Sequence, residues 1–215
     1  MGQGVIALLS EGGDVLSNRV GGTIELVHVA TRTPKPEVDT LGARDSRDVF
    51  DVARDPDVDV LIELIGGTTV AKDLVVEALN HGKHVVTANK ALLADHGEEL
   101  FALAESKGVA LRFEAAVAGG IPVIEAVKTS LAGNHVSSVA GIINGTGNFI
   151  LTEMAAKGRE FSDVLAEAQA LGYAEADPTF DVDGTDAAQK LVLLSSLAFG
   201  AVSYTHLTLP TKPFV

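Results

Sequence analysis

The sequence predicts an α/β fold built on a parallel sheet. Segments rich in Val, Ile and Leu, which favour strands, lie at residues 23–30, 59–64, 83–88 and 109–116. Residues 70–82 and 90–108 lie between these strands, carry apolar side chains at helical spacing and close in a glycine. Alternation of helices with nearly continuous apolar strands is typical of a parallel sheet that is covered on both faces.

The composition excludes several classes of protein. A chain of 215 residues is long enough for one large domain or two small ones. Its formal net charge of -13 leaves no basic stripe for a nucleic acid. The absence of cysteine excludes disulfides, zinc–thiolate sites and cysteine nucleophiles. The longest apolar run, at 191–202, is too short to span a bilayer, and no signal peptide is apparent, so we expect a cytoplasmic protein with no membrane partner.

The first stretch, MGQGVIALLS, has the pattern of a helix that has already begun. A dinucleotide-binding sheet starts with a strand, continues through G-x-G-x-x-G, and then enters a helix whose N-terminus holds the pyrophosphate. Gly2 stands where the third glycine of that motif would be, so we expect the first strand and the first two glycines to be missing. Residues 1–118 are therefore predicted to be an NAD(P)-binding domain truncated at its N-terminus.

The end of strand 23–30 bears on the choice of cofactor. An acid at this place prefers the 2′-hydroxyl of NAD, whereas a nearby arginine accommodates the 2′-phosphate of NADP. The chain has no acid here, but it has Arg32, with Lys35 close by. This favours NADP, with a solvated loop charge as the alternative.

Two further stretches follow strands at the edge of the sheet where ligands bind. IGGTT, residues 65–69, supplies Gly66, Gly67 and Thr68, and paired glycines let a backbone approach a ligand closely. The alternative is an ordinary turn between a strand and a helix. TANK places Lys90 at the end of the next strand, where a lysine can contact a phosphate, a carboxylate or a reacting oxygen.

The last part of the chain has a different pattern. We expect a strand at 135–144 and helices at 121–133, 145–158, 161–172 and 185–199. Residues 119–202 are predicted to form a second domain. Residues 203–215 are rich in Thr, Leu and Pro without a clear period, and we expect them to be a non-native tail.

The loop EADPTFDVDGTDAAQK, Glu175 to Lys190, concentrates five carboxylates and ends in one lysine. Burying an unpartnered carboxylate costs several kcal/mol, so a solvated acidic turn is one interpretation. A calcium loop is another, but Lys190 follows where a closing acid would be needed. A cationic organic ligand fits better, and the ammonium group of an amino acid is the natural candidate.

The spacing inside this loop predicts a catalytic site. If Gly184 and Thr185 start a helix, Asp186 and Lys190 stand four residues apart on one face. A lysine near a helix N-terminus can hold its proton less tightly and exchange it with an alcohol or aldehyde oxygen. With a nicotinamide site and an amino-acid site, this suggests reversible reduction of an aldehyde on an amino acid.

The stretch AQALGYAEADPTFDVDGTDAAQK, residues 168–190, resembles the signature of the homoserine dehydrogenase family. The stretches IELIGG, TANKALLA, FEAAVAGGIPVI and INGTGNFIL agree in order, and the resemblance runs from Met1 to about Val202. It implies NAD(P)-dependent interconversion of aspartate semialdehyde and homoserine, in threonine and methionine biosynthesis. It also implies an incomplete Rossmann-type parallel sheet followed by an α+β catalytic and dimerisation domain, and a homodimer when the protein is complete.

The resemblance implies a role for individual residues. The catalytic residues would be Lys190, Lys90, Asp186 and Asp181. The substrate would be bound by Glu175, Thr146, Lys90 and Tyr173, with Glu175 on the ammonium group. The cofactor would contact Gly2, Arg32, Gly66, Gly67, Thr68 and Lys90. A monovalent cation, expected to be sodium, would be held mainly by backbone carbonyls at Glu114, Val117, Gly119 and Ile121.

Two functions of other kinds are alternatives to this one. An inactive fragment that only binds an amino acid would bind homoserine but not NADPH. A phosphorylating aspartate-semialdehyde dehydrogenase needs a cysteine thioester, which a chain without cysteine cannot form. The sequence leaves open the number of subunits and the presence of a fused aspartokinase or regulatory domain.

Overall fold

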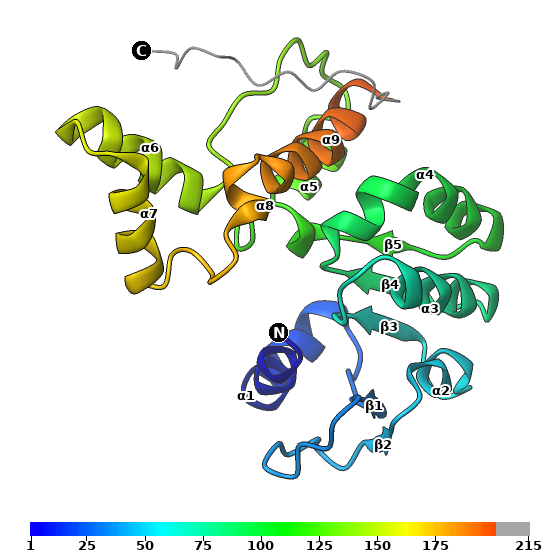
Figure 1. The fold of residues 1–215 in the computed structure, drawn as a ribbon. Coiled ribbons are helices and arrows are strands. Elements are labelled where there is room, and N and C mark those ends of the chain that lie inside the picture. Colours follow the sequence, from blue (N-terminus) through cyan, green and yellow to red (C-terminus); the bar gives the residue numbers. More distant parts are fainter. Residues whose placement is uncertain (201–215) are drawn as a thin grey trace. The chain divides into compact units, whose positions relative to one another are not determined.

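The computed structural model describes residues 1–200, which divide into two compact units (Figure 1). The first unit is Met1–Phe113 and the second begins at Glu114. The predicted tail, residues 203–215, lies outside the described residues.

The strands of the first unit form two small sheets. One sheet pairs β1 (His28–Ala30) with β2 (Arg44–Ser46), and the other has the order β3 (Val60–Glu63), β4 (His84–Thr87), β5 (Leu111–Arg112). Every pairing between these strands is parallel, which confirms the predicted α/β class.

Strand lengths and two short elements differ from the prediction. The strand expected at 23–30 forms at its last three residues, and the one expected at 109–116 ends after Arg112 and gives way to the 3-10 helix η1 (Glu114–Ala116). Strand β2 and helix α2 (Val49–Arg54) were not predicted, because Arg-Asp-Ser has no apolar pattern and α2 has only six residues. Helix α2 begins after Asp48, whose side chain accepts a hydrogen bond from the backbone of Phe50.

Helices α3 (Thr69–Asn80) and α4 (Lys90–Lys107) confirm the predicted helices and pack against each other beside the three-stranded sheet (Figure 1). Helix α3 buries Ala71, Leu74, Val75 and Ala78 at the spacing of one helical face.

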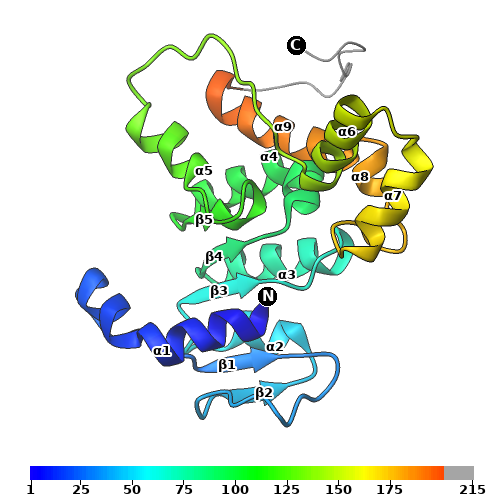
Figure 2. The same cartoon turned by 90° about the vertical axis from the view of Figure 1, so that its left-hand side faces the viewer.

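The opposite face of β3 is open, although the sequence predicted a sheet covered on both faces. The side chains of Leu61 and Glu63 are buried, whereas Val60 and Ile62 are 48% and 45% exposed. Helix α1 (Gly2–Val20, Figure 2) confirms the helix predicted at the start of the chain. None of its residues is fully buried, and Val5, Ile6 and Leu9 are half-buried.

Asp55 joins the small sheet to the rest of the first unit. It follows the last residue of α2 and is only 7% exposed. Its Oδ2 atom lies 2.7 Å from His28 Nδ1 on β1 and 2.5 Å from Arg44 Nη2 on β2. Its Oδ1 atom accepts a hydrogen bond from the backbone of Asp57 at 3.0 Å. One buried carboxylate thus connects two strands with the turn that leads into β3.

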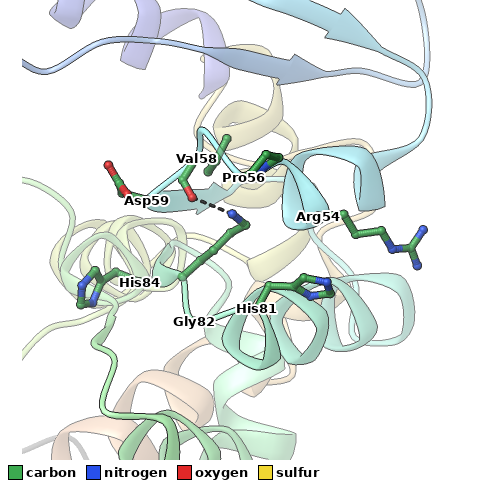
Figure 3. Close-up of a pocket in the computed structure, with 8 residues that line it drawn as sticks. Arg54, Pro56, Val58, Asp59, His81, Gly82 and His84 are labelled. Carbon is green, nitrogen blue, oxygen red and sulfur yellow. Dashed lines mark hydrogen bonds between the residues drawn. The ribbon is translucent and has the colours of Figure 1, made fainter.

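Lys83 holds the same turn from the other side. Its side chain is buried, and its Nζ donates to the carbonyl oxygens of Asp55 at 2.5 Å and Val58 at 2.6 Å. Lys83 lines a pocket of about 530 Å³ together with His81 and His84. Figure 3 shows these two histidines beside Val58 and Asp59. Asp59 directly precedes β3, Lys83 directly precedes β4, and His84 is the first residue of β4. The pocket therefore lies at the amino ends of these strands, away from the carboxyl edge where we predicted the cofactor.

In its described part, the second unit consists of helices joined by irregular segments. Its elements are η1 (Glu114–Ala116), α5 (Val123–Glu125), the π-helix η2 (Ala126–Ser130), α6 (Gly145–Lys157), α7 (Phe161–Ala170), α8 (Thr179–Val182) and α9 (Thr185–Phe199). The helices predicted at 145–158, 161–172 and 185–199 are confirmed. The helix predicted at 121–133 is shorter and changes from α to π geometry, and α8 was not predicted.

The strand predicted at 135–144 is wrong. Up to residue 200 the second unit has no strand, and this segment is irregular, with Ile142 77% exposed. A strand needs a hydrogen-bonded neighbour, and Val and Ile content alone cannot supply one.

A buried apolar cluster of the second unit lies between α6 and α7. Ile150, Val164, Ala168 and Ala174 form a buried cluster, and Phe149 packs against it. This cluster fixes the start of α6 and the loop that follows α7. None of the helices within residues 1–200 is long and apolar enough to cross a membrane.

We predict that the first unit loses stability in acid through Asp55. The pKa of Asp55 is lowered, first by the hydrogen bond from the Asp57 backbone and then by His28 and Arg44, against the opposing effect of burial. A carboxyl group whose pKa is lower in the folded state contributes stability above its unfolded pKa of about 3.9, and this contribution is lost as the pH falls through the folded value.

The free energy of unfolding should therefore fall on acidification below about pH 5, and Asp55→Asn should reduce that fall. Urea unfolding at a series of pH values measures this. Asp59→Asn, which changes an exposed carboxylate four residues away, is the matched control. An unchanged acid dependence in Asp55→Asn would contradict the prediction.

Candidate active site

A pocket of about 440 Å³ in the second unit brings together residues from four segments of the chain. It is lined by Asn144, Gly145, Thr146, Phe149, Tyr173, Asp181, Asp186 and Lys190. Five of the predicted site residues lie here, although they are spread over 45 positions of the sequence.

Lys190 is held at this pocket by two hydrogen bonds. Its Nζ donates to Asp186 Oδ2 at 2.6 Å and to the carbonyl oxygen of Ile143 at 2.8 Å. The side chains of Asp186 and Lys190 come from the first two turns of α9, as their spacing of four residues predicted. An ammonium group has three hydrogens, so these bonds leave one for a ligand oxygen in the pocket.

Asn144 was not predicted, and it connects the two carboxylates of the pocket. Its Nδ2 donates to Asp181 Oδ1 at 2.7 Å and to Asp186 Oδ2 at 2.9 Å. Its Oδ1 accepts from the backbone of Gly147 at 2.6 Å and so caps α6. An asparagine directly before a predicted helix is a recognisable cap, but its two contacts across 37 and 42 residues leave no trace in the local sequence.

Thr146 and Tyr173 form another wall of the pocket. The hydroxyl of Thr146 is buried and donates to the carbonyl oxygen of Tyr173 at 2.6 Å. Because its one hydrogen is used, this oxygen can only accept a hydrogen bond from a ligand. The ring of Tyr173 meets that of Phe149 edge-on, with centroids 5.2 Å apart, and the pair supplies an apolar surface.

The remaining acids of the loop do not face this pocket. Glu175 is exposed, and its main-chain carbonyl accepts from Gln169 Nε2 at 3.1 Å. The pKa of Asp177 is lowered, mainly by the hydroxyl and then by the backbone N–H of Thr179. Asp183 is exposed and accepts a hydrogen bond from the backbone of Thr185 at 2.8 Å.

In the first unit, a buried carboxylate organises the predicted cofactor edge. Glu63, at the end of β3, is only 1% exposed. Its Oε1 accepts from the backbone of Ile65 at 2.9 Å and of Gly66 at 3.2 Å, and its Oε2 accepts from Thr87 Oγ1 at 2.5 Å. Gly66 and Gly67 have φ angles of 74° and 73°, a region that glycine adopts without strain. Glu63 was missed because one acid in an apolar strand carries no distinctive signal.

Asn89 completes this network and leads into Lys90. Its backbone donates to Thr87 Oγ1 at 3.0 Å, and its Nδ2 donates to the carbonyl oxygen of Gly67 at 2.7 Å. Its Oδ1 caps α4, of which Lys90 is the first residue. Thr68 directly precedes α3, so the ends of β3 and β4 bring Gly66, Gly67, Thr68 and Lys90 to one edge of the sheet.

The other two predicted cofactor residues lie outside this network. Arg32 is exposed and lies two positions after the end of β1. Gly2 is exposed and is the first residue of α1.

The four predicted cation ligands lie between residues 114 and 121 of the second unit. Glu114 Oε1 accepts from the backbone of Ile124, and its Oε2 accepts from that of Glu125, both at 2.9 Å. The carbonyl oxygen of Ile121 accepts from Val123 at 2.8 Å. An oxygen-only donor set with one carboxylate is the chemistry that a hard cation prefers. Over residues 1–200, no group of three or more His, Cys, Asp and Glu side chains is arranged to hold a metal ion.

The model of the family domain described as "Homoserine dehydrogenase, NAD binding domain" matches residues 1–114, more than half of the chain. The chain belongs to the homoserine dehydrogenase family. A second model, described as "Homoserine dehydrogenase", matches residues 122–209. The resemblance stated from the sequence is thereby confirmed.

Individual homoserine dehydrogenases are similar to this chain in sequence and structure. The protein from Pseudomonas aeruginosa is 58% identical over 200 residues, which are 93% of this chain and 46% of that protein. The crystal structure of a homoserine dehydrogenase from Thiobacillus denitrificans matches this chain with a TM-score of 0.87 and 51% sequence identity. The match covers 93% of this chain and 46% of that chain. A hyperthermophilic archaeal homoserine dehydrogenase in complex with NADPH has a TM-score of 0.67 at 29% identity, with 73% of this chain and 48% of that chain covered. The chain spans about half the length of these relatives.

We predict that Glu63→Gln loosens the IGG turn. Glutamine has the size of glutamate, but its NH₂ group replaces an oxygen that accepts hydrogen bonds. That NH₂ group must face either the backbone N–H groups of Ile65 and Gly66 or the hydroxyl of Thr87, all of which donate to Glu63. A buried donor left without an acceptor should cost about 1–3 kcal/mol of unfolding free energy. Hydrogen exchange at the amides of Ile65 and Gly66 should also accelerate.

The matched control is Glu99→Gln, which removes an exposed carboxylate paired with Lys72 at 2.8 Å. Surface ion pairs of this kind contribute at most about 1 kcal/mol. Equal stability losses and unchanged exchange in the two variants would show that Glu63 does not hold the turn.

Proposed function

We propose that this chain carries the cofactor and substrate sites of a homoserine dehydrogenase, which interconverts L-homoserine and L-aspartate 4-semialdehyde with NAD(P). The observation that carries the proposal is the placement of Lys190. Two acceptors fix its ammonium group and leave one hydrogen for the pocket, as a proton donor to an aldehyde oxygen requires. Membership of the homoserine dehydrogenase family and the match to its NAD-binding domain support this proposal.

The charges of the pocket suit an amino acid that carries an aldehyde. Asp181 and Asp186 give the pocket two carboxylates, and Lys190 supplies one positive charge. The resulting negative balance favours a ligand with an ammonium group. Thr146 Oγ1 offers an acceptor to that group, and Glu175 is proposed as a second acceptor from the loop. Tyr173 and Phe149 face the methylene carbon of the substrate.

A nicotinamide cofactor, when bound, would supply the hydride that the aldehyde carbon accepts in the reduction. Lys190 gives a proton to the aldehyde oxygen as the alkoxide develops, and it takes the proton back from the alcohol in the reverse direction. Asp186 keeps the ammonium group directed toward that oxygen. Lys90 is proposed to contact both substrate and cofactor.

For the cofactor, we propose binding at Gly66, Gly67 and Thr68, with Gly2 at the start of α1. Arg32 favours NADP over NAD, because a guanidinium group can pair with a 2′-phosphate. The NADPH complex of the archaeal relative supports the use of a phosphorylated cofactor in the family.

A monovalent cation, sodium, is proposed at Glu114, Val117, Gly119 and Ile121. The oxygen donors of that turn suit such an ion. The complete protein is proposed to be a cytoplasmic homodimer acting in threonine and methionine biosynthesis. Apolar side chains that stay exposed in the second unit, Ile142 at 77% and Leu151 at 67%, support an association of this kind.

We predict that Lys190→Ala abolishes turnover in this chain. Removing a general acid typically lowers the rate by about 100-fold to 10,000-fold. The measurement is NADPH oxidation with aspartate semialdehyde as the substrate. Lys157→Ala, which removes an exposed lysine paired with Glu153 at 2.7 Å on α6, should keep the parent rate.

Full activity in Lys190→Ala would overturn the assignment of the proton donor. If the parent chain binds homoserine but neither binds NADPH nor turns over, the chain acts only as an amino-acid-binding module, and the proposal of catalysis fails.

A further inference from the structure

We propose that Asn144 is a positioning residue for the reaction, which places both carboxylates of the pocket and, through Asp186, the ammonium group of Lys190. This inference rests on the proposed function. No role was expected for Asn144 from the sequence, and its importance follows from the three hydrogen bonds of one side-chain amide.

The orientation of this amide is determined by its surroundings. The backbone N–H of Gly147 is a donor, so the atom that it meets at 2.6 Å must be the amide oxygen. The NH₂ group then points toward Asp181 and Asp186 and gives one hydrogen to each. Rotating the amide would set its oxygen against two carboxylates and its NH₂ group against another donor. Asparagine thus supplies one acceptor and two donors within the length of a short side chain.

The two carboxylates need this shared donor. Asp181 and Asp186 contact the same nitrogen atom, so they lie close together and repel each other. The ammonium group of Lys190 bonds Oδ2 of Asp186, and Asn144 bonds that same oxygen. The titratable groups that line the pocket around Asn144 are Asp181 from α8, Asp186 and Lys190 from α9, and Tyr173 from the loop after α7. Asn144 therefore sets the position of the acceptor that directs the lysine.

Packing alone does not fix Asp181. Helix α8 has four residues and buries none of them. A helix this short is not stable by itself, so its place depends on contacts with its neighbours. The bond from Asn144 to Asp181 spans 37 residues and ties α8 to the start of α6, which the apolar cluster of Ile150 holds in place.

Two variants separate positioning from capping. Aspartate and serine both cap helices through a side-chain oxygen, so Asn144→Asp and Asn144→Ser should keep the N-terminus of α6. Neither can give hydrogens to two carboxylates, and Asn144→Asp adds a third negative charge. We expect kcat to fall by about tenfold in Asn144→Ser and by about 100-fold in Asn144→Asp, since hydrogen bonds to charged groups contribute on this scale.

The pH–rate profile provides a readout that a purely structural role would not change. The added carboxylate of Asn144→Asp should favour the protonated lysine, so the alkaline limb of its profile should move to higher pH. Asn144→Ser should not show this displacement. Asp48→Ala, which removes the side-chain cap of α2 in the other unit, should lower the unfolding temperature and leave the profile unchanged. Parent values of kcat and an unshifted profile in both Asn144 variants would overturn the proposal.

A separate measurement distinguishes this inference from the proposed function. Hydrogen exchange of the side-chain NH₂ groups, followed by NMR in the unmodified chain, needs no turnover. The NH₂ of Asn144 should exchange at least about tenfold more slowly than that of the exposed Asn134, because two charged acceptors hold it. Protection of Asn144 in a chain without turnover would leave the positioning inference standing while the proposed function fails. Exchange as fast as that of Asn134 would overturn the inference whatever the activity.

Discussion

A carboxylate that leaves water must find donors for its oxygens, and this constraint shapes both units of the chain. Asp55, Glu63 and Asp186 are each at most 7% exposed. Each accepts hydrogen bonds from separate segments: strands β1 and β2 for Asp55, the IGG turn and β4 for Glu63, and Asn144 with Lys190 for Asp186. Since an unpartnered carboxylate would be costly, these acids fix the relative positions of the segments that satisfy them.

The same constraint explains how one loop carries five acids. Asp177 and Asp183 accept hydrogen bonds from residues two positions further along, so they stabilise local turns while they stay in water. Asp181 and Asp186 face the pocket and share the amide of Asn144. Two of the acids thus stabilise turns, and two others form part of the binding pocket. Asp186 is the buried acid of this loop, and Lys190 supplies the positive charge beside it.

Features set by local pattern could be predicted from the sequence. The helices α3, α4, α6, α7 and α9 have apolar spacing and glycine ends, and the pairing of Asp186 with Lys190 follows from a spacing of four residues. Features that depend on distant partners could not. The strand expected at 135–144 has the residues of a strand but no neighbour within the described part of its unit. Asn144 and Glu63 have ordinary local contexts, and their roles come from contacts that only the folded chain creates.

The pocket also shows why its polar and apolar walls belong together. The hydroxyl of Thr146 holds the main chain at Tyr173, and this bond places the aromatic ring against Phe149. Thr146 is two residues after Asn144, whose oxygen caps the same helix and whose nitrogen places the carboxylates. The first turn of α6 therefore positions the apolar wall through one side chain and the charged wall through the other. A displacement of that turn would alter substrate contact and proton transfer together, because both walls are attached to it.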